Sequence, residues 1–246
     1  METSAIESGA GAQDHPVVSH EEWLAARTAF LAKEKAFTRV RDELSRERRE
    51  LPWERVEKSY LFDGPRGEET LADLFAGMGQ LLVYHFMFPP EADEGCPHCS
   101  YWADNFDGID AHLAHRDTSL VAISRAPIDK IERFRERMGW SFRWLSSGRN
   151  DFNFDFQASF RPEELRSGTA LFNYRREDPG REDREGISAF TRDGRGQVFH
   201  TYSTYARGID IVNGAYNLLD MTAKGRDEGG LEFTQAWVRH HDRYDR

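Results

Sequence analysis

Cysteine is scarce in this chain of 246 residues, which contains only Cys96 and Cys99. One pair of thiols cannot build the disulfide framework of a small secreted domain. Long hydrophobic runs are missing too, because no stretch approaches the roughly 18 apolar residues that a membrane span requires. The first 15 residues lack both the basic and the apolar segment of a signal peptide. We therefore expect a cytoplasmic protein that has no membrane partner.

Positive charge is also in short supply, with 33 Lys and Arg residues against 43 Asp and Glu residues and a formal net charge of -10. Such an excess of negative charge argues against a nucleic-acid partner, because phosphate backbones are bound by basic surfaces. Hydrophobic residues make up 39% of the chain and aromatic residues 13%, which is enough for the core of one large domain. In a reducing cytosol, a close pair of cysteines favours a catalytic or metal-binding role.

We divide the chain into four predicted segments. They are a flexible N-terminus (1–18), an N-terminal helical extension (19–52), an α/β domain (53–220) and a C-terminal surface tail (221–246). The extension starts with the capping box of Ser19 and Glu22. Large apolar side chains then recur every seven residues, at Trp23, Phe30, Phe37 and Leu44. This stripe predicts a helix face packed on the domain. A second hypothesis is that the helix is swapped between the two subunits of a homodimer, where the stripe packs on the partner.

The α/β domain is organised around the stretch from Gln80 to Asp104. The continuous apolar run Leu81–Phe88 predicts a buried strand in the middle of a sheet. Pro89 and Pro90 end the strand, since proline cannot donate to a ladder. After a short acidic loop, a helix is expected to begin at the Cys-Pro-His-Cys tetrapeptide that contains both cysteines. The sequence thus predicts a strand, a loop and a helix with a CxxC motif at its start.

The flanking segments predict the rest of a mixed sheet. Thr118–Ser124 is a second buried strand, and Pro127 opens an amphipathic helix that Gly139 ends. This order makes a βαβ crossover, so the two buried strands should be parallel. Further elements are a strand at 57–62, a strand at 140–145, a hairpin at 187–202 and a helix at 209–219.

The segment Asn150–Phe156 alternates polar residues with phenylalanine. This period of two predicts a strand whose phenylalanines point inward. A functional interpretation, with Asp151 and Asp155 as metal ligands or a base, finds no matching third ligand in the sequence. We therefore expect a strand here.

The cysteine pair has three interpretations: a redox dithiol, a metal site and two structural cysteines. A closed zinc site usually needs a second ligand pair, which the sequence lacks. In the redox interpretation, Cys96 at a helix start is the nucleophilic thiolate and Cys99 is the resolving thiol. His98 would lower the pKa of Cys96, whereas the acidic residues at 91–94 would raise it if they lie close. We take Cys96, Pro97, His98 and Cys99 as the candidate catalytic residues.

Four residues are predicted to line the substrate rim of this site: Tyr101, Trp102, His85 and His200. The redox interpretation requires no cofactor and no metal. Its alternative is a copper-binding protein that uses the cysteine pair and one of His85, His98 or His200, because thiolates and imidazole suit Cu(I). A third hypothesis is a non-catalytic interaction protein that uses the long N-terminal helix.

Many segments in order resemble the DUF899 family of bacterial proteins. They are VVSHEEWLAAR, LPWERVEK, LLVYHFMF, GCPHCSYWADNFDG, SRAPIDKIE, HTYSTYARG, NGAYNLLD and KGRDE. Members of this family are described as predicted dithiol-disulfide oxidoreductases with a thioredoxin-like fold. The resemblance implies an α/β thioredoxin-like domain with a central mixed sheet flanked by helices, extended here by a long N-terminal helix. The tetrapeptide is similar to that of bacterial periplasmic thiol oxidases.

The chain departs from the thioredoxin pattern just before the predicted hairpin. A cis-proline is expected there, facing the sulfur, but the segment is Arg184-Glu185-Gly186-Ile187-Ser188. That proline forms part of the backbone on which a peptide substrate docks. Its loss favours a small-molecule thiol, disulfide or peroxide over a protein client, with an unknown redox partner completing the cycle.

Overall fold

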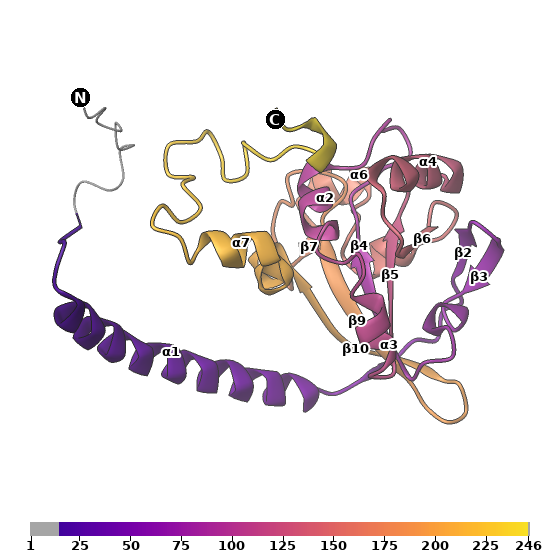
Figure 1. The fold of residues 1–246 in the computed structure, drawn as a ribbon. Coiled ribbons are helices and arrows are strands. Elements are labelled where there is room, and N and C mark those ends of the chain that lie inside the picture. The colour runs from indigo at the N-terminus through magenta and orange to yellow at the C-terminus, as the bar shows by residue number, and fades with distance from the viewer. Residues whose placement is uncertain (1–14, 246) are drawn as a thin grey trace. The chain divides into compact units, whose positions relative to one another are not determined.

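The computed structural model of the chain describes residues 15–245 (Figure 1). Residues 1–14, which hold most of the predicted flexible N-terminus, lie outside the described residues. The chain forms two compact units. One contains the described part of Met1–Leu51 together with Leu218–Asp227, and the other contains Pro52–Asn217 together with Glu228–Arg246.

The first unit is dominated by helix α1, His20–Arg49. The predicted capping box is present, because the Ser19 hydroxyl accepts the backbone N–H of Glu22 while the Glu22 carboxylate accepts the backbone N–H of Ser19. Ion pairs form between neighbouring turns of the helix. In one of them, a guanidinium nitrogen of Arg46 lies 2.5 Å from Oε1 of Glu50. No side chain of α1 is buried, and Phe37 of the apolar stripe is 68% exposed. The stripe is therefore not buried within its own unit, and its packing on the domain stays a prediction.

The second unit is built on an eight-stranded sheet in the order β1-β10-β9-β4-β5-β6-β2-β3. Its strands are β1 (Glu54–Arg55), β2 (Leu61–Gly64), β3 (Gly67–Thr70), β4 (Gln80–His85), β5 (Thr118–Ser124), β6 (Arg143–Ser146), β9 (Gly186–Arg192) and β10 (Val198–Tyr205). A separate pair consists of β7 (Leu171–Phe172) and β8 (Arg175–Arg176). In Figure 1, β4 and β5 run side by side in the middle of the sheet. Both predicted central strands are therefore present.

Short helices connect these strands. They are η1 (Asp73–Phe75), α2 (Pro97–Ala103), α3 (Asp110–Ala114), α4 (Ile128–Met138), α5 (Phe152–Asp155), α6 (Pro162–Ser167), η2 (Ala206–Val212), α7 (Gly214–Leu219) and η3 (His241–Arg243). Pro127 is the N-cap of α4 and Gly139 ends it in a left-handed conformation, φ 69°. Within residues 15–245, no helix is long and apolar enough to cross a membrane.

The sheet has the mixed topology that the thioredoxin-like prediction requires. Strands β4 and β5 are parallel and joined through α2, whereas β9 pairs with β4 in the antiparallel direction. Strand β10 continues the β9 hairpin on the outer side. The central mixed sheet flanked by helices is confirmed. The strand expected at 57–62 is displaced, because only its last two residues belong to β2. Strands β1 and β3, which we did not predict, extend the edges of the sheet.

Side chains of β4 alternate between the two faces of the sheet. On one face, Leu81 and Val83 pack in a large apolar cluster that includes Phe152 and Phe190. On the other face, the Tyr84 hydroxyl donates to the carbonyl oxygen of Cys99 in α2, at 3.1 Å. Helix α2, with the cysteine pair at its start, is thereby fixed to the middle of the sheet.

The prediction of a strand at Asn150–Phe156 is wrong, since Phe152–Asp155 is the short helix α5. Phe152 and Phe156 are four residues apart, so a helical turn places them on one side with ring centroids 4.7 Å apart. Asp151 and Asp155 are not metal ligands here, because both carboxylates pair with Lys58, at 2.9 and 2.7 Å.

Two further boundaries differ from the prediction. The helix expected at 209–219 is divided into η2 and α7, which meet at the buried Asn213. The Asn213 side chain accepts the backbone N–H of Tyr216 at 2.9 Å and so caps the second piece. The strand expected at 140–145 begins only at Arg143, because Trp140 and Phe142 are buried among aromatic rings ahead of β6.

Candidate active site

Cys96 and Cys99 lie at the start of α2, and both thiols are free. Cys96 is the N-cap residue and Pro97 is the first residue of the helix. The backbone N–H of Cys96 donates to the Met87 carbonyl at 3.1 Å, and the Cys96 carbonyl accepts the N–H of Ser100 at 2.9 Å. Cys96 is half-buried, whereas Cys99, one turn into the helix, is fully buried. The outer thiol is the one that a substrate can reach.

The loop before α2 is held tightly against the sheet. A Cβ atom at Gly95 would lie 2.7 Å from ring carbons of both Phe86 and Phe134, so only glycine fits at this approach. The Lys130 ammonium donates to the carbonyl oxygens of Pro90 and Ala92, each at 2.9 Å. The loop therefore positions Cys96 directly beyond the end of β4.

The immediate surroundings of Cys96 favour its thiolate. A hydrogen bond from the Cys99 thiol is the largest cause of a Cys96 pKa well below the usual value, partial burial opposes it, and the His98 imidazole lowers the pKa further. His98 Nδ1 lies 3.9 Å from the Cys96 sulfur. In return, the hydrogen bond to Cys96 raises the pKa of His98. Each of the two side chains therefore favours the charged form of the other.

The acidic residues of the loop do not counteract this arrangement. Glu94 forms an ion pair with Arg137 at 3.1 Å and a second one with Arg243. Glu91 and Asp93 are exposed to solvent, where screening weakens their effect on Cys96. The question that the sequence left open is therefore answered in favour of a lowered Cys96 pKa.

Cys99 has the opposite character. Burial is the largest cause of a Cys99 pKa well above the usual value, and the neighbouring Cys96 thiolate adds to it. The Cys99 sulfur accepts the backbone N–H of Met87 at 3.4 Å. Its single S–H is shared between two acceptors, the Cys96 sulfur and Oε2 of Glu185, which lies 3.2 Å from the Cys99 sulfur. The pKa values of the two cysteines are therefore shifted in opposite directions, down for the outer thiol and up for the inner one.

Glu185 is a neighbour of the cysteine pair that sequence reasoning did not single out. It stands immediately before β9, at the place where a thioredoxin-like chain is expected to carry its cis-proline, and no cis peptide bond occurs among residues 15–245. Burial, followed by the negative charge of Cys96, raises the pKa of Glu185 to about 7. The only signal in the sequence was an ionisable side chain at this position.

A C-terminal strap, which we define as residues 228–245, lies beside the cysteine pair. The Phe233 ring stands edge-on to the His98 imidazole with centroids 6.0 Å apart, and His98 also bonds to the backbone of Gln235. His240 is buried and its Nε2 lies 2.8 Å from the Gly95 carbonyl oxygen. Most of this strap is exposed, as expected for the predicted surface tail at 221–246, but Val238 and His240 are buried and Phe233 and Gln235 contact His98.

Two of the predicted rim residues belong to the core instead. Trp102 is 1% exposed, and its indole N–H donates to the Ile209 carbonyl at 2.9 Å. Tyr101 is 9% exposed and stands edge-on to Tyr216, with centroids 5.1 Å apart. Both residues lie in the helix that follows the cysteines, where burial against neighbouring aromatic rings leaves no surface for a substrate.

His85 and His200 are also wrong as rim residues, because they lie in the apolar cluster on the sheet face opposite α2. His85 is fully buried against Phe152, and a chain of hydroxyls links His85 to His200 through Ser188 and Ser203, with distances of 2.8, 2.7 and 2.7 Å. Burial lowers the pKa of both imidazoles, that of His85 to about 3.

The copper-binding alternative loses two of its three candidate histidines in this arrangement. A metal carrier would need a distant histidine beside the two thiolates, but His85 and His200 are committed to the other face of the sheet. In the part of the chain that the structure describes, no three Cys, His, Asp or Glu residues are grouped to hold a metal ion. His98, whose Nδ1 lies 3.9 Å from the Cys96 sulfur, is the one of the three candidate histidines that lies beside the cysteine pair, and copper binding through it stays a prediction.

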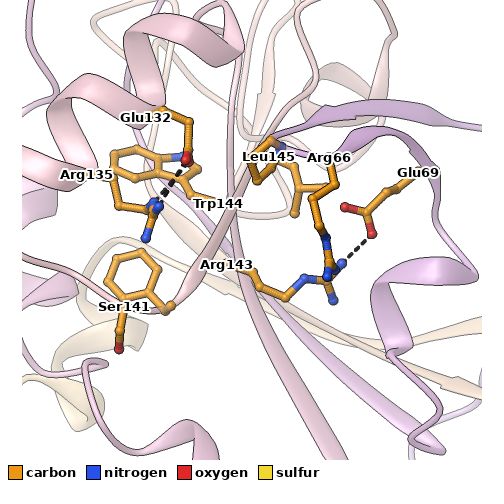
Figure 2. Close-up of a pocket in the computed structure, with 10 residues that line it drawn as sticks. Arg66, Glu69, Glu132, Arg135, Ser141, Arg143, Trp144 and Leu145 are labelled. Atoms are coloured by element: carbon orange, nitrogen blue, oxygen red, sulfur yellow. Dashed lines mark hydrogen bonds and ion pairs between the residues drawn. The ribbon is translucent and has the colours of Figure 1, made fainter.

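A separate pocket of about 370 Å³ opens at the other end of the sheet, between α4, β6 and the β2–β3 hairpin. Figure 2 shows its basic residues, two of which are paired: Arg135 with Glu132 at 2.9 Å, and Arg143 with Glu69 at 2.5 Å. None of its lining residues belongs to the cysteine pair or its neighbours. The cysteine site is therefore independent of this pocket.

Several solved structures are similar to this chain, all at low identity. Peroxidoxin BcpB from Mycobacterium tuberculosis is 17% identical, with a TM-score of 0.45 and coverage of 66% of this chain and 93% of that chain. Peroxiredoxin Q from Xanthomonas campestris is 14% identical, with a TM-score of 0.42 and coverage of 64% and 90%. The mitochondrial 2-Cys peroxiredoxin from Plasmodium falciparum is 10% identical, with a TM-score of 0.39 and coverage of 68% and 93%. Similarity at this level does not specify an activity.

Comparison with curated proteins gave no match. The family comparison is more decisive, because one family model spans almost the entire sequence, from residue 12 to residue 244. This range includes the cysteine pair, Glu185 and all but the last residue of the C-terminal strap. The chain belongs to the family described as bacterial protein of unknown function, DUF899.

Proposed function

We propose that this protein is a thiol-disulfide oxidoreductase in which Cys96 is the nucleophile and Cys99 the resolving thiol. The proposal is supported above all by the polarisation of the pair. The pKa of Cys96 is lowered by Cys99 and His98, while burial raises that of Cys99. Because the thiolate is the reactive form of cysteine, this difference supports Cys96 as the nucleophile and Cys99 as the resolving thiol.

The reaction with a disulfide substrate takes two steps. The Cys96 thiolate attacks one sulfur of the substrate, forms a mixed disulfide and releases the other half as a thiolate. Cys99 then loses its proton and attacks the Cys96 sulfur, which releases the second half and leaves the Cys96–Cys99 disulfide. One disulfide is reduced to two thiols and the protein dithiol is oxidised. Both steps are reversible, so the potential of the partner sets the direction.

A peroxide can enter the same cycle. The Cys96 thiolate attacks one peroxide oxygen, which forms a sulfenic acid and releases an alcohol or water after protonation. Cys99 then condenses with the sulfenic acid, and water leaves as the disulfide forms. Because the final disulfide is the same, one reducing partner serves both substrates.

Small substrates are favoured by the surroundings of Cys96. The strap places Phe233 and Gln235 against His98, so access to the half-buried Cys96 is narrow. The backbone before β9 carries Glu185, whose carboxylate faces Cys99, in place of a cis-proline. We therefore propose a small thiol, disulfide or peroxide as substrate, and an unidentified partner that restores the dithiol.

The proposal is tested with the aryl disulfide dithiobis(nitrobenzoate), whose released thiolate is coloured. Reduced wild-type protein should release two aryl thiolates per chain, one in each step. Cys99→Ser should release one and retain the second aryl group on Cys96, which intact mass analysis detects. Cys96→Ser should react slowly, because burial keeps the remaining Cys99 thiol neutral.

The two variants control for each other, since each removes one sulfur from the same turn of α2. If Cys96→Ser releases aryl thiolate as fast as the wild type, the assignment of the nucleophile is wrong. If both variants turn over a small disulfide as well as the wild type does, the dithiol mechanism itself is wrong.

A further inference from the structure

The second step of this reaction poses a problem of proton transfer. Cys99 must lose a proton before it attacks, but it is fully buried and burial raises its pKa. A buried thiol has no access to water as a proton acceptor. The step therefore requires a basic group within hydrogen-bond reach of the Cys99 sulfur.

Such a group is in place, because Oε2 of Glu185 lies 3.2 Å from the Cys99 sulfur and accepts its S–H. Glu185 lies 86 residues after Cys99 in the sequence, immediately before β9. The pairing of β9 with β4 brings its carboxylate close to the Cys99 sulfur. Ser100 is the next polar residue of α2, but its hydroxyl donates to the Cys96 carbonyl at 3.0 Å and so cannot serve as a base.

We propose that Glu185 is the general base of the resolving step, a role that rests on the dithiol function proposed above. As Cys99 attacks the Cys96 sulfur of a mixed disulfide, its proton passes to Oε2 of Glu185. The new sulfur–sulfur bond forms between Cys99 and Cys96, and the substrate thiolate leaves with the electron pair of the broken bond. In the reverse direction, Glu185 returns the proton to Cys99.

The charges around Glu185 favour proton transfer at the moment when Cys99 attacks the mixed disulfide. Groups that face it are Cys96, His98 and Cys99 of α2, Tyr84 of β4 and the adjacent Arg184. In the reduced protein, the Cys96 thiolate is the main charge that raises the pKa of Glu185. Once Cys96 is bonded to the substrate, this negative charge has left. The pKa of Glu185 then falls, so its carboxylate is ionised when Cys99 must lose its proton.

A purely electrostatic role would have the opposite consequence. The negative charge of Glu185 raises the pKa of Cys99. If Glu185 acted only through this charge, Glu185→Gln would make the Cys99 thiolate easier to form and the second step faster. If Glu185 accepts the proton, the same substitution makes the second step slower. The direction of the change therefore separates the two roles.

The experiment follows the release of both aryl thiolates from dithiobis(nitrobenzoate) by stopped flow, with full-length reduced protein. For Glu185→Gln we expect a first phase close to that of the wild type and a second phase slower by roughly 10²- to 10⁴-fold, the usual contribution of a general base. Glu182→Gln, an exposed carboxylate of the same loop, should leave both phases unchanged. Glu185→Asp keeps a carboxylate and should recover part of the rate.

The pH profile supplies a second criterion. The wild-type second phase should rise with pH as the Glu185 carboxylate becomes ionised, and Glu185→Gln should lose this rise. A second phase in Glu185→Gln that is as fast as, or faster than, that of the wild type would overturn the proposal. A wild-type protein that never releases the second thiolate would instead overturn the dithiol function, so the two failures are distinguishable.

Discussion

His85 offers a quantitative test of the assignment of the two strand histidines to the core. Its imidazole is fully buried against Phe152, and Nε2 lies 2.8 Å from the Ser188 hydroxyl. The perturbation is His85→Gln, which keeps a polar group near Ser188 but cannot take up a proton. Because glutamine does not titrate in this pH range, the difference in stability between the two proteins should depend on pH.

The magnitude follows from the depressed pKa of His85, which burial lowers from 6.5 to about 3. Below pH 6.5 the unfolded chain binds a proton at this residue and the folded chain does not. The stabilising contribution is therefore complete above pH 6.5 and is lost as the pH falls through about 3. The loss is about 1.4 kcal/mol per pH unit and roughly 5 kcal/mol in total. This is comparable to the whole stability of a typical domain, about 5–15 kcal/mol.

The assay is urea unfolding of both proteins under reducing conditions, at several pH values from about 7 to about 4, below the usual imidazole pKa of about 6.5. Near neutral pH, His85→Gln should be less stable than the wild type. As the pH falls, the difference should shrink by about 1.4 kcal/mol per unit, since only the wild type loses the His85 contribution. Parallel pH profiles for the two proteins would refute the assignment of His85 as a buried, neutral side chain.

Two further substitutions test the strap and the interior of α2. Phe233→Ala removes the ring beside His98, so the rate with a peptide-sized disulfide should rise relative to that with a small disulfide; an unchanged ratio would show that the strap does not limit access. Trp102→Phe leaves the Ile209 carbonyl without its donor and should cost about 1–3 kcal/mol in urea unfolding, with no change in the KM for a small disulfide. A changed KM together with unchanged stability would restore Trp102 to the substrate rim.

The sequence predicted the parts of the fold that depend on local pattern. The continuous apolar run at Leu81–Phe88 identified the central strand, and the Ser19 capping box identified the start of α1. Cys96 was correctly placed at the start of a helix, because two prolines and a loop separate it from the strand. In these segments the signal lies within a few neighbouring residues.

The failures have a different physical origin. Asn150–Phe156 fits a period of two, but Phe152 and Phe156 also fit one helical turn, and packing against the cluster decided between them. Glu185 lies 86 residues from Cys99 in sequence, and the register of β9 on β4 brings the two together. Contacts set by strand register or by a returning tail, such as Phe233 beside His98, have no local signature.

The central claim is that Cys96 is ionised near neutral pH, and ultraviolet titration of the thiolate tests it most directly. The reduced wild-type protein should retain thiolate absorbance below neutral pH, because the Cys99 thiol and His98 stabilise the Cys96 thiolate. Cys96→Ser should lose this absorbance, since burial keeps Cys99 neutral. The account is contradicted if the wild-type absorbance appears only at the ordinary thiol pKa of about 8.5, or if Cys96→Ser titrates in the same way as the wild type.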